Sequence, residues 1–124
     1  MTYLDTHTAM WLFGGERHRF SAVGNERIRH DELLVSPAVV LELQLLHEIK
    51  RFKSTALRVV EVLSKDLGLR VCKLPFASIM ESALDLVWTR DPFDRLIVAH
   101  ARANDATLLT KDEHIRKHYR RAIW

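Results

Sequence analysis

A chain of 124 residues has the length of one ordinary domain, long enough to bury a hydrophobic core without disulfides or a structural metal. Hydrophobic residues make up 48% of the chain and charged residues 28%, a balance that excludes a disordered or fibrous protein. The net charge of +3 suits a polyanionic partner, but so small an excess excludes no class of function.

Cysteine content and hydropathy bear on where the protein works. Cys72 is the only cysteine and has no partner for an internal disulfide. Asp5 interrupts the apolar stretch that a secretory signal peptide would carry. No apolar run approaches the roughly 18 residues that a membrane-spanning helix needs. We therefore expect a cytoplasmic protein with no membrane role.

Hydrophobic segments of strand length alternate along the chain with longer segments of helical period. This pattern predicts a single α/β domain over residues 1–124, with a mostly parallel central sheet of four to five strands flanked by α-helices. The expected strands are residues 2–5, 33–35, 70–74, 106–110 and 122–124. Helices are expected at residues 8–13, within 16–32, after 36, at 54–67 and 76–87, from 92 to about 103, and after 112.

Three helix starts have clear signals in the sequence. Ser36 and Pro37 have the residue types of an N-cap and a first helical position, and Asp91 and Pro92 form a second such pair. Asp112 is expected to cap the last short helix.

Four acidic residues gather at one edge of the expected sheet. Asp5 and Asp112 fall at or just beyond the C-terminal ends of strands. Glu42 and Asp94 fall early in helices that begin at the same edge. Ligands of open α/β sheets bind at this edge, so it is the expected functional site.

Two of these acids occupy apolar helix faces. Glu42 falls inside an arc with Val39, Leu46 and Ile49, and Asp94 has apolar residues three, four and seven positions further on. An inward-facing carboxylate costs several kcal/mol or more unless its charge is compensated. A cation would compensate it, and oxygen-only ligands favour Mg²⁺ or Mn²⁺ over Zn²⁺.

A hard cation held by carboxylates suits one reaction especially well. Such an ion lowers the pKa of a bound water and neutralises charge on a phosphodiester and its leaving oxygen. The acidic cluster therefore predicts phosphodiester hydrolysis.

Four segments carry a resemblance to a known family. They begin at Tyr3, Ser36, Arg90 and Leu108 and have the sequences YLDTH, SPAVVLEL, RDPFDRLIVAHA and LLTKD. In order and spacing they resemble the signature blocks of the PIN-domain family, and they extend from one end of the chain to the other. A single block would be common in unrelated proteins, but the four in order are specific.

The resemblance implies a role for each matched acid. Asp5, Glu42, Asp94 and Asp112 correspond to the acidic quartet that holds one or two Mg²⁺ or Mn²⁺ ions in the family, with Asp5 and Asp94 the strongest ligand candidates. In the same blocks, the hydroxyls of Thr6 and Thr110 would orient a water or a carboxylate.

Further polar residues near these blocks are weaker candidates. Asp91 is better explained as a helix cap that pairs with Arg95, and a supporting role in metal binding is the alternative. His7 stands where the family often has Asn, Ser or another small polar residue, which leaves the substrate preference open. His7, Lys111 and Arg116 are candidate substrate contacts, although a solvated surface is the simpler explanation for the basic C-terminal segment.

Histidine and aromatic residues outside the blocks have structural explanations. His114 and His118 are four residues apart, but no cysteine or third histidine completes a zinc site. Trp11, Leu12 and Phe13 are most simply core residues, and any that remain exposed would mark a dimer or partner surface.

The resemblance implies a metal-dependent endoribonuclease, the VapC-type toxin of a VapBC toxin-antitoxin pair. The expected partners are an RNA substrate, a cognate VapB-type antitoxin whose tail covers the acidic site, and a second copy in a homodimer or toxin-antitoxin hetero-oligomer. Two alternatives stay open. One is a catalytically silent PIN-fold module that binds RNA or protein, and the other is an RNA-processing or DNA-directed PIN nuclease.

Overall fold

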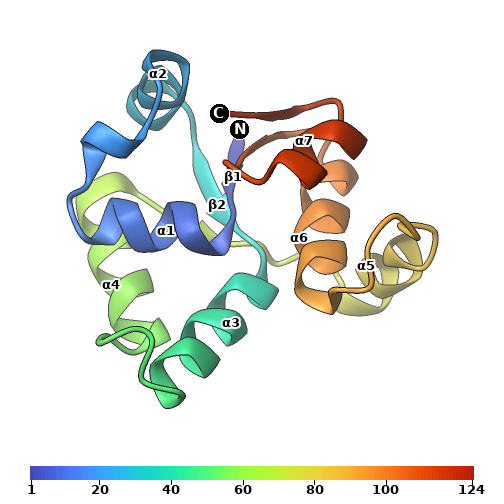
Figure 1. The fold of residues 1–124 in the computed structure, drawn as a ribbon, viewed down its shortest axis with the longest axis horizontal. Helices are drawn as coiled ribbons and strands as arrows, with labels where there is room; N and C mark the ends of the chain where they lie inside the picture. The colour runs from blue at the N-terminus through green and yellow to red at the C-terminus, as the bar shows by residue number, and fades with distance from the viewer.

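The computed structural model describes all residues from 1 to 124 and has a five-stranded sheet at its centre (Figure 1). All strand pairs are parallel, and the order across the sheet is β3-β2-β1-β4-β5. The strands are β1 (Thr2–Leu4), β2 (Leu33–Val35), β3 (Arg70–Val71), β4 (Thr107–Leu109) and β5 (Ala122–Ile123). The predicted α/β fold is confirmed.

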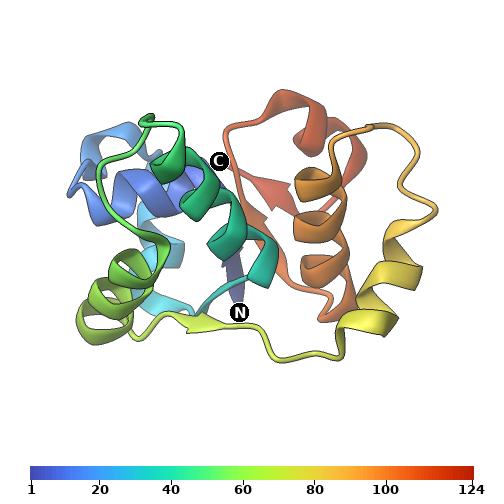
Figure 2. The same ribbon diagram turned by 90° about the horizontal axis from the view of Figure 1, so that it is seen from below.

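Seven α-helices and one 3₁₀ turn connect the strands. They are α1 (Thr6–Phe13), the 3₁₀ turn η1 (Arg17–Arg19), α2 (Ala22–His30), α3 (Pro37–Glu48), α4 (Ala56–Leu67), α5 (Phe76–Ala83), α6 (Pro92–Ala103) and α7 (Glu113–His118). Helices α1, α3 and α4 pack on one another, α5 packs against α6, and α3 also contacts α6 (Figure 2). None of the helices combines the length and the apolar character that crossing a bilayer requires.

Three helix caps predicted from the sequence are confirmed. The side chain of Ser36 accepts a hydrogen bond from a backbone N–H in the first turn of α3, and Asp91 does the same for α6. Asp112 caps α7 in the same way. Because all three helices begin just after a strand or at the same end of the sheet, these caps fix where the nearby acids point.

Several predicted boundaries were wrong by a few residues. The first strand ends at Leu4 because Asp5 instead caps α1, which begins at Thr6 and not at residue 8. The strand expected at 70–74 has only two residues, and the helix expected at 76–87 ends at Ala83. Hydrophobic period alone does not place such ends, because capping and turn contacts decide them.

The core surrounds the central strands. Tyr3 and Leu4 of β1, and Leu108 and Leu109 of β4, are fully buried. The 29 buried residues form one continuous cluster, so both halves of the chain share a single core. The site at the end of β1 and β4 is therefore built on the buried centre of the fold.

Ser36 joins two elements below the site and supplies a stability prediction. Its buried Oγ accepts a hydrogen bond from Ala38 N at 3.0 Å and lies 2.9 Å from Nδ1 of buried His100 on α6. Ser36→Ala is expected to lower the free energy of unfolding by about 2 kcal/mol, because it removes a cap and a buried polar partner. Urea unfolding measures this, with Ser64→Ala on exposed α4 surface as the control; equal midpoints for the two variants would contradict it.

Candidate active site

The acidic residues predicted from the sequence line one cavity at the C-terminal edge of the sheet. Its volume is about 320 Å³. Asp5 follows β1, Asp112 follows β4 by three residues, and Glu42 and Asp94 belong to α3 and α6. The complete lining is Asp5, Thr6, His7, Glu42, Asp91, Asp94, Ile97, Lys111, Asp112 and Ile115.

Asp5 is the most deeply buried acid in the cavity. Its Oδ1 accepts a hydrogen bond from Thr8 N at 2.9 Å, which caps α1, and its Oδ2 accepts one from the Thr110 hydroxyl. Burial raises the pKa of the Asp5 carboxyl above its usual value, and the hydrogen bonds from Thr110 and Thr8 partly oppose that rise. Both oxygens are therefore held in fixed positions.

Two threonine hydroxyls hold other acids in place. Thr110 Oγ1 also accepts a hydrogen bond from Asp112 N at 3.0 Å, so one side chain connects Asp5 with the backbone of Asp112. Thr6 donates its hydroxyl hydrogen to Glu42 on α3. Burial raises the pKa of Glu42, and this hydrogen bond opposes the rise. The two hydroxyls thus orient carboxylates.

Asp94 differs from the other acids because its carboxylate accepts no hydrogen bond from the protein. Its helix position faces inward, since Ile97, Val98 and Ala101 are all buried. Burial, followed by the negative charges of Asp91, Asp112, Glu42 and Asp5, raises the pKa of Asp94 to about 7. Its negative charge is therefore the least compensated in the cavity.

No side chain of the protein forms an ion pair with this cluster, although Lys111 and His7 also line the cavity. Elsewhere in the molecule Asp105 pairs with Arg121 at 2.7 Å and Asp85 with Arg102 at 2.8 Å, whereas none of the five cavity carboxylates forms an ion pair. No three His, Cys, Asp or Glu side chains are gathered tightly enough to form a finished metal site. The acids and the hydroxyls of Thr6 and Thr110 nevertheless offer oxygen atoms, and such donors fit a hard divalent cation such as Mg²⁺ or Mn²⁺.

Asp91 lines the cavity in addition to capping its helix. Its Oδ1 accepts hydrogen bonds from Phe93 N and Asp94 N at 2.8 and 3.1 Å. The predicted ion pair with Arg95 was wrong, because Arg95 Nε donates to the Thr89 carbonyl at 2.8 Å. The capping geometry turns Asp91 towards the start of the helix and away from Arg95.

The apolar arc expected around Glu42 is only partly buried. Val39 is inaccessible to solvent, but Ile49 is 61% exposed, because the C-terminal end of α3 extends away from the strands (Figure 1). Glu42 is half-buried at the edge of this arc. The position of Glu42 therefore depends more on Thr6 than on an enclosing apolar face.

The candidate substrate contacts lie in different places. His7 and Lys111 are exposed and line the cavity, whereas Arg116 lies outside it and approaches the Lys111 carbonyl at 3.4 Å. His118 stacks on Trp88 at a centroid distance of 4.9 Å, and His114 meets the same ring edge-on at 5.1 Å. The two histidines thus form a small aromatic group with Trp88.

Sequence reasoning missed two apolar residues of the cavity. Ile97 and Ile115 lie in its lining and are almost completely buried. Each follows a cavity acid by three residues on the same helix face, a spacing that would have indicated them. Their side chains form the apolar part of the cavity lining.

The fold and the sequence agree on the family. Residues 2–121 match the PIN domain family, and the chain therefore belongs to it, which confirms the resemblance of the four sequence blocks. Ribonuclease VapC22 of Mycobacterium tuberculosis is 34% identical over 121 residues, which cover 93% of this chain and 89% of that protein.

Solved structures with a similar fold come from toxin-antitoxin complexes. VapBC2 from Rickettsia felis, bound to a DNA fragment from its promoter, matches with a TM-score of 0.66 at 18% identity, over 94% of this chain and 92% of that one. VapBC-1 from nontypeable Haemophilus influenzae matches with a TM-score of 0.62 at 20% identity, over 98% and 92% of the two chains. At these identities the likeness concerns the fold.

Proposed function

We propose that this protein is a metal-dependent endoribonuclease and the VapC-type toxin of a toxin-antitoxin pair. One observation carries the proposal: five carboxylates from four separate segments of the chain line one cavity, and none forms an ion pair. The 34% identity to a protein named as a ribonuclease supports the same activity and the choice of RNA as substrate.

The side chains that line the acidic cavity suit hydrolysis of a phosphodiester. Asp5, Glu42, Asp94 and Asp112 would hold Mg²⁺ or Mn²⁺, with Thr6 and Thr110 orienting Glu42 and Asp5. A divalent ion held there would supply a water of lowered pKa and offset charge on the phosphate. In this hydrolysis a water oxygen would form the new bond to phosphorus while the bond from phosphorus to O3′ breaks, and O3′ would leave with a proton. The products would be a 5′-phosphate and a 3′-hydroxyl.

Cleavage of total cellular RNA by the purified protein tests this activity. Discrete fragments are expected with Mg²⁺ or Mn²⁺ and none with EDTA. Absence of cleavage together with absence of metal binding in calorimetry would instead identify a catalytically silent module. RNA and DNA oligonucleotides of one sequence distinguish the remaining alternative, since a preference for DNA would overturn the substrate class.

The uncompensated acids also suggest how an antitoxin would silence the site. A Lys or Arg from an antitoxin tail would find carboxylates without cationic partners and would compete there with the metal. The similar folds solved as VapBC complexes support such a partner. A structure of the complex in which the tail lies far from Asp5 and Asp94 would refute this inhibition.

Thr110 provides a test of how the metal site is oriented. Thr110→Val keeps the shape of the side chain but removes the donor to Asp5 and the acceptor for Asp112 N. We expect it to weaken Mn²⁺ binding by about tenfold, the usual effect of losing a residue that orients a ligand. Calorimetric titration with Mn²⁺ measures the change. Thr110→Ser should retain wild-type affinity, and equal loss in both variants would contradict a role of the hydroxyl.

A further inference from the structure

Aromatic side chains from opposite ends of the chain meet beside the acidic cavity. The ring centroids of Trp11 and Trp124 lie 5.6 Å apart, and Phe20 contacts both rings, at 6.4 and 5.2 Å. We call Trp11, Phe20 and Trp124 the aromatic cluster. Phe20 is buried, whereas the two indoles are only half-buried and keep part of their surface in solvent. The prediction that Trp11 belongs to the core therefore holds only in part.

Two separate contacts connect the aromatic cluster with the cavity. The His7 ring lines the cavity and lies 6.0 Å from the Trp11 ring. Lys111 also lines the cavity, and its Nζ lies 5.8 Å from the centre of the Trp124 ring. One contact therefore connects the cavity with Trp11, and the other connects it with Trp124. Because the two indoles also contact each other, the cavity and the aromatic cluster form one continuous surface.

Cationic side chains lie next to both indole rings of the aromatic cluster. The guanidinium of Arg19 lies over Trp11 at 5.3 Å from the ring centre. Arg19 Nε pairs with Glu16 at 3.1 Å, but its two terminal nitrogens make no hydrogen bond and remain available. Lys111 is exposed and forms no ion pair. A buried core does not require such cations, whereas a surface that meets a phosphate chain does.

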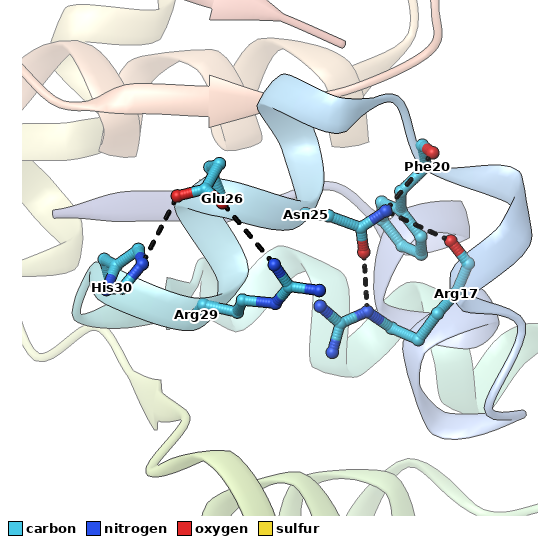
Figure 3. A network of polar contacts seen from close by, with 6 residues as sticks. All are labelled: Arg17, Phe20, Asn25, Glu26, Arg29 and His30. Atoms are coloured by element: carbon cyan, nitrogen blue, oxygen red, sulfur yellow. Dashed lines mark hydrogen bonds and ion pairs between the residues drawn. The ribbon is translucent and has the colours of Figure 1, made fainter.

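A hydrogen-bond network holds this surface in a fixed shape. Figure 3 shows Asn25 on α2 between Arg17 and Phe20. Its Oδ1 accepts from Arg17 Nε at 2.8 Å, and its Nδ2 donates to the carbonyls of Arg17 and Phe20 at 3.4 and 3.3 Å. The network therefore fixes η1, which places Phe20 against Trp124 and Arg19 over Trp11.

We propose that the aromatic cluster, with Arg19 and Lys111, binds the nucleotides of single-stranded RNA that adjoin the phosphodiester in the acidic cavity. The proposal rests on the proposed function only for the choice of RNA. Half-exposed indoles interleaved with exposed cations have the chemistry of single-strand binding, in which bases stack on aromatic rings and cations neutralise phosphates. Paired bases in a duplex do not offer these faces, so the site discriminates against double-stranded RNA.

Trp88 offers a matched control for the indoles. It is half-buried like Trp11, but it stacks on His118, which lies parallel to it within 4°, and it does not line the acidic cavity. Arg120 is the matching control for Arg19, because each is an exposed arginine with one ion-pair partner. Both control residues lie outside the surface formed by the cavity and the aromatic cluster.

The test measures binding of a fluorescent single-stranded RNA decamer to the whole protein in EDTA, by anisotropy. Trp11→Leu is expected to raise Kd by about tenfold, while Trp88→Leu leaves it unchanged. Arg19→Gln is expected to lower the slope of log Kd against log salt by about 0.7, whereas Arg120→Gln does not. Circular dichroism melting checks folding, and Arg19→Gln keeps the test decisive if Trp11→Leu does not fold.

The outcomes separate this inference from the proposed activity. Equal affinity of the Trp11 and Trp88 variants, with equal salt slopes of the two arginine variants, would overturn the inference and leave the indoles as packing or as a contact for another protein. The same loss of affinity for duplex RNA would also overturn it. A loss confined to single strands supports the inference even if no RNA is cleaved with Mg²⁺, a result that would count against the nuclease alone.

Discussion

Asp94→Asn is expected to lower kcat/KM for RNA cleavage by at least about 1000-fold, the scale of losing a central electrostatic contact in an active site. Asp94 is the cavity acid that accepts no hydrogen bond from the protein, and burial with neighbouring negative charges raises its pKa to about 7. A bound cation would therefore stabilise the ionised form of Asp94 more than that of the other cavity acids. Asparagine keeps its size but removes the charge that would hold the ion.

Kinetics on a labelled RNA oligonucleotide at saturating Mg²⁺ measure this loss. Asp66→Asn supplies the matched control, because it makes the same chemical change on an exposed face of α4 outside the cavity. The control should cleave as the wild type does. If Asp94→Asn kept more than a tenth of the wild-type activity, the proposed metal site would be wrong.

The metal-free protein is expected to lose stability as the pH rises from about 4 to 7. Asp94 has a pKa of about 7 in the folded state and an ordinary value of 3.8 in the unfolded chain, so the folded state binds its proton more tightly. Protonation of such a group stabilises the fold fully below its unfolded pKa of 3.8, and this stabilisation is lost as the pH rises through its folded pKa of about 7. Asp5 and Glu42, whose pKa values are also raised, act in the same direction.

Melting curves of wild type and Asp94→Asn in EDTA isolate this effect. At pH 8 the variant is expected to be more stable by about 1 kcal/mol, well below the full value of the pKa shift because Asp94 is only partly buried. The difference should vanish near pH 4. Mn²⁺ should stabilise the wild type at pH 8 more than the variant. A variant that melts below the wild type at pH 8 in EDTA would contradict the raised pKa.

Residues near strand ends and helix starts were predictable because their positions follow from local pattern. An acid placed just after a strand of a parallel sheet must lie at its C-terminal edge, and Asp5 and Asp112 do so. Ser36 and Asp91 capped their helices as expected. Caps depend on two or three neighbouring residues, so the sequence alone carries the necessary information.

Contacts between distant segments were not predictable in the same way. No local pattern indicates that Trp124 packs on Trp11, because the contact depends on β5 pairing with β4 at the edge of the sheet. The expected pairing of Asp91 with Arg95 failed for a related reason, since the neighbouring loop offered Arg95 the Thr89 carbonyl. Roles of the cavity residues in metal binding and catalysis stay predictions until the experiments above are done.

The order of strands in the sheet determines when the acidic cavity can form during synthesis of the chain. Asp5 is made 105 positions before its partner Thr110, so β4 can pair with β1 only after the chain has reached β4. Asp112 and Lys111 also come from this late segment. A nascent chain that has not yet reached residue 110 therefore carries only part of the acidic cavity. If this protein cuts RNA, such an incomplete chain lacks part of the site with which it would do so.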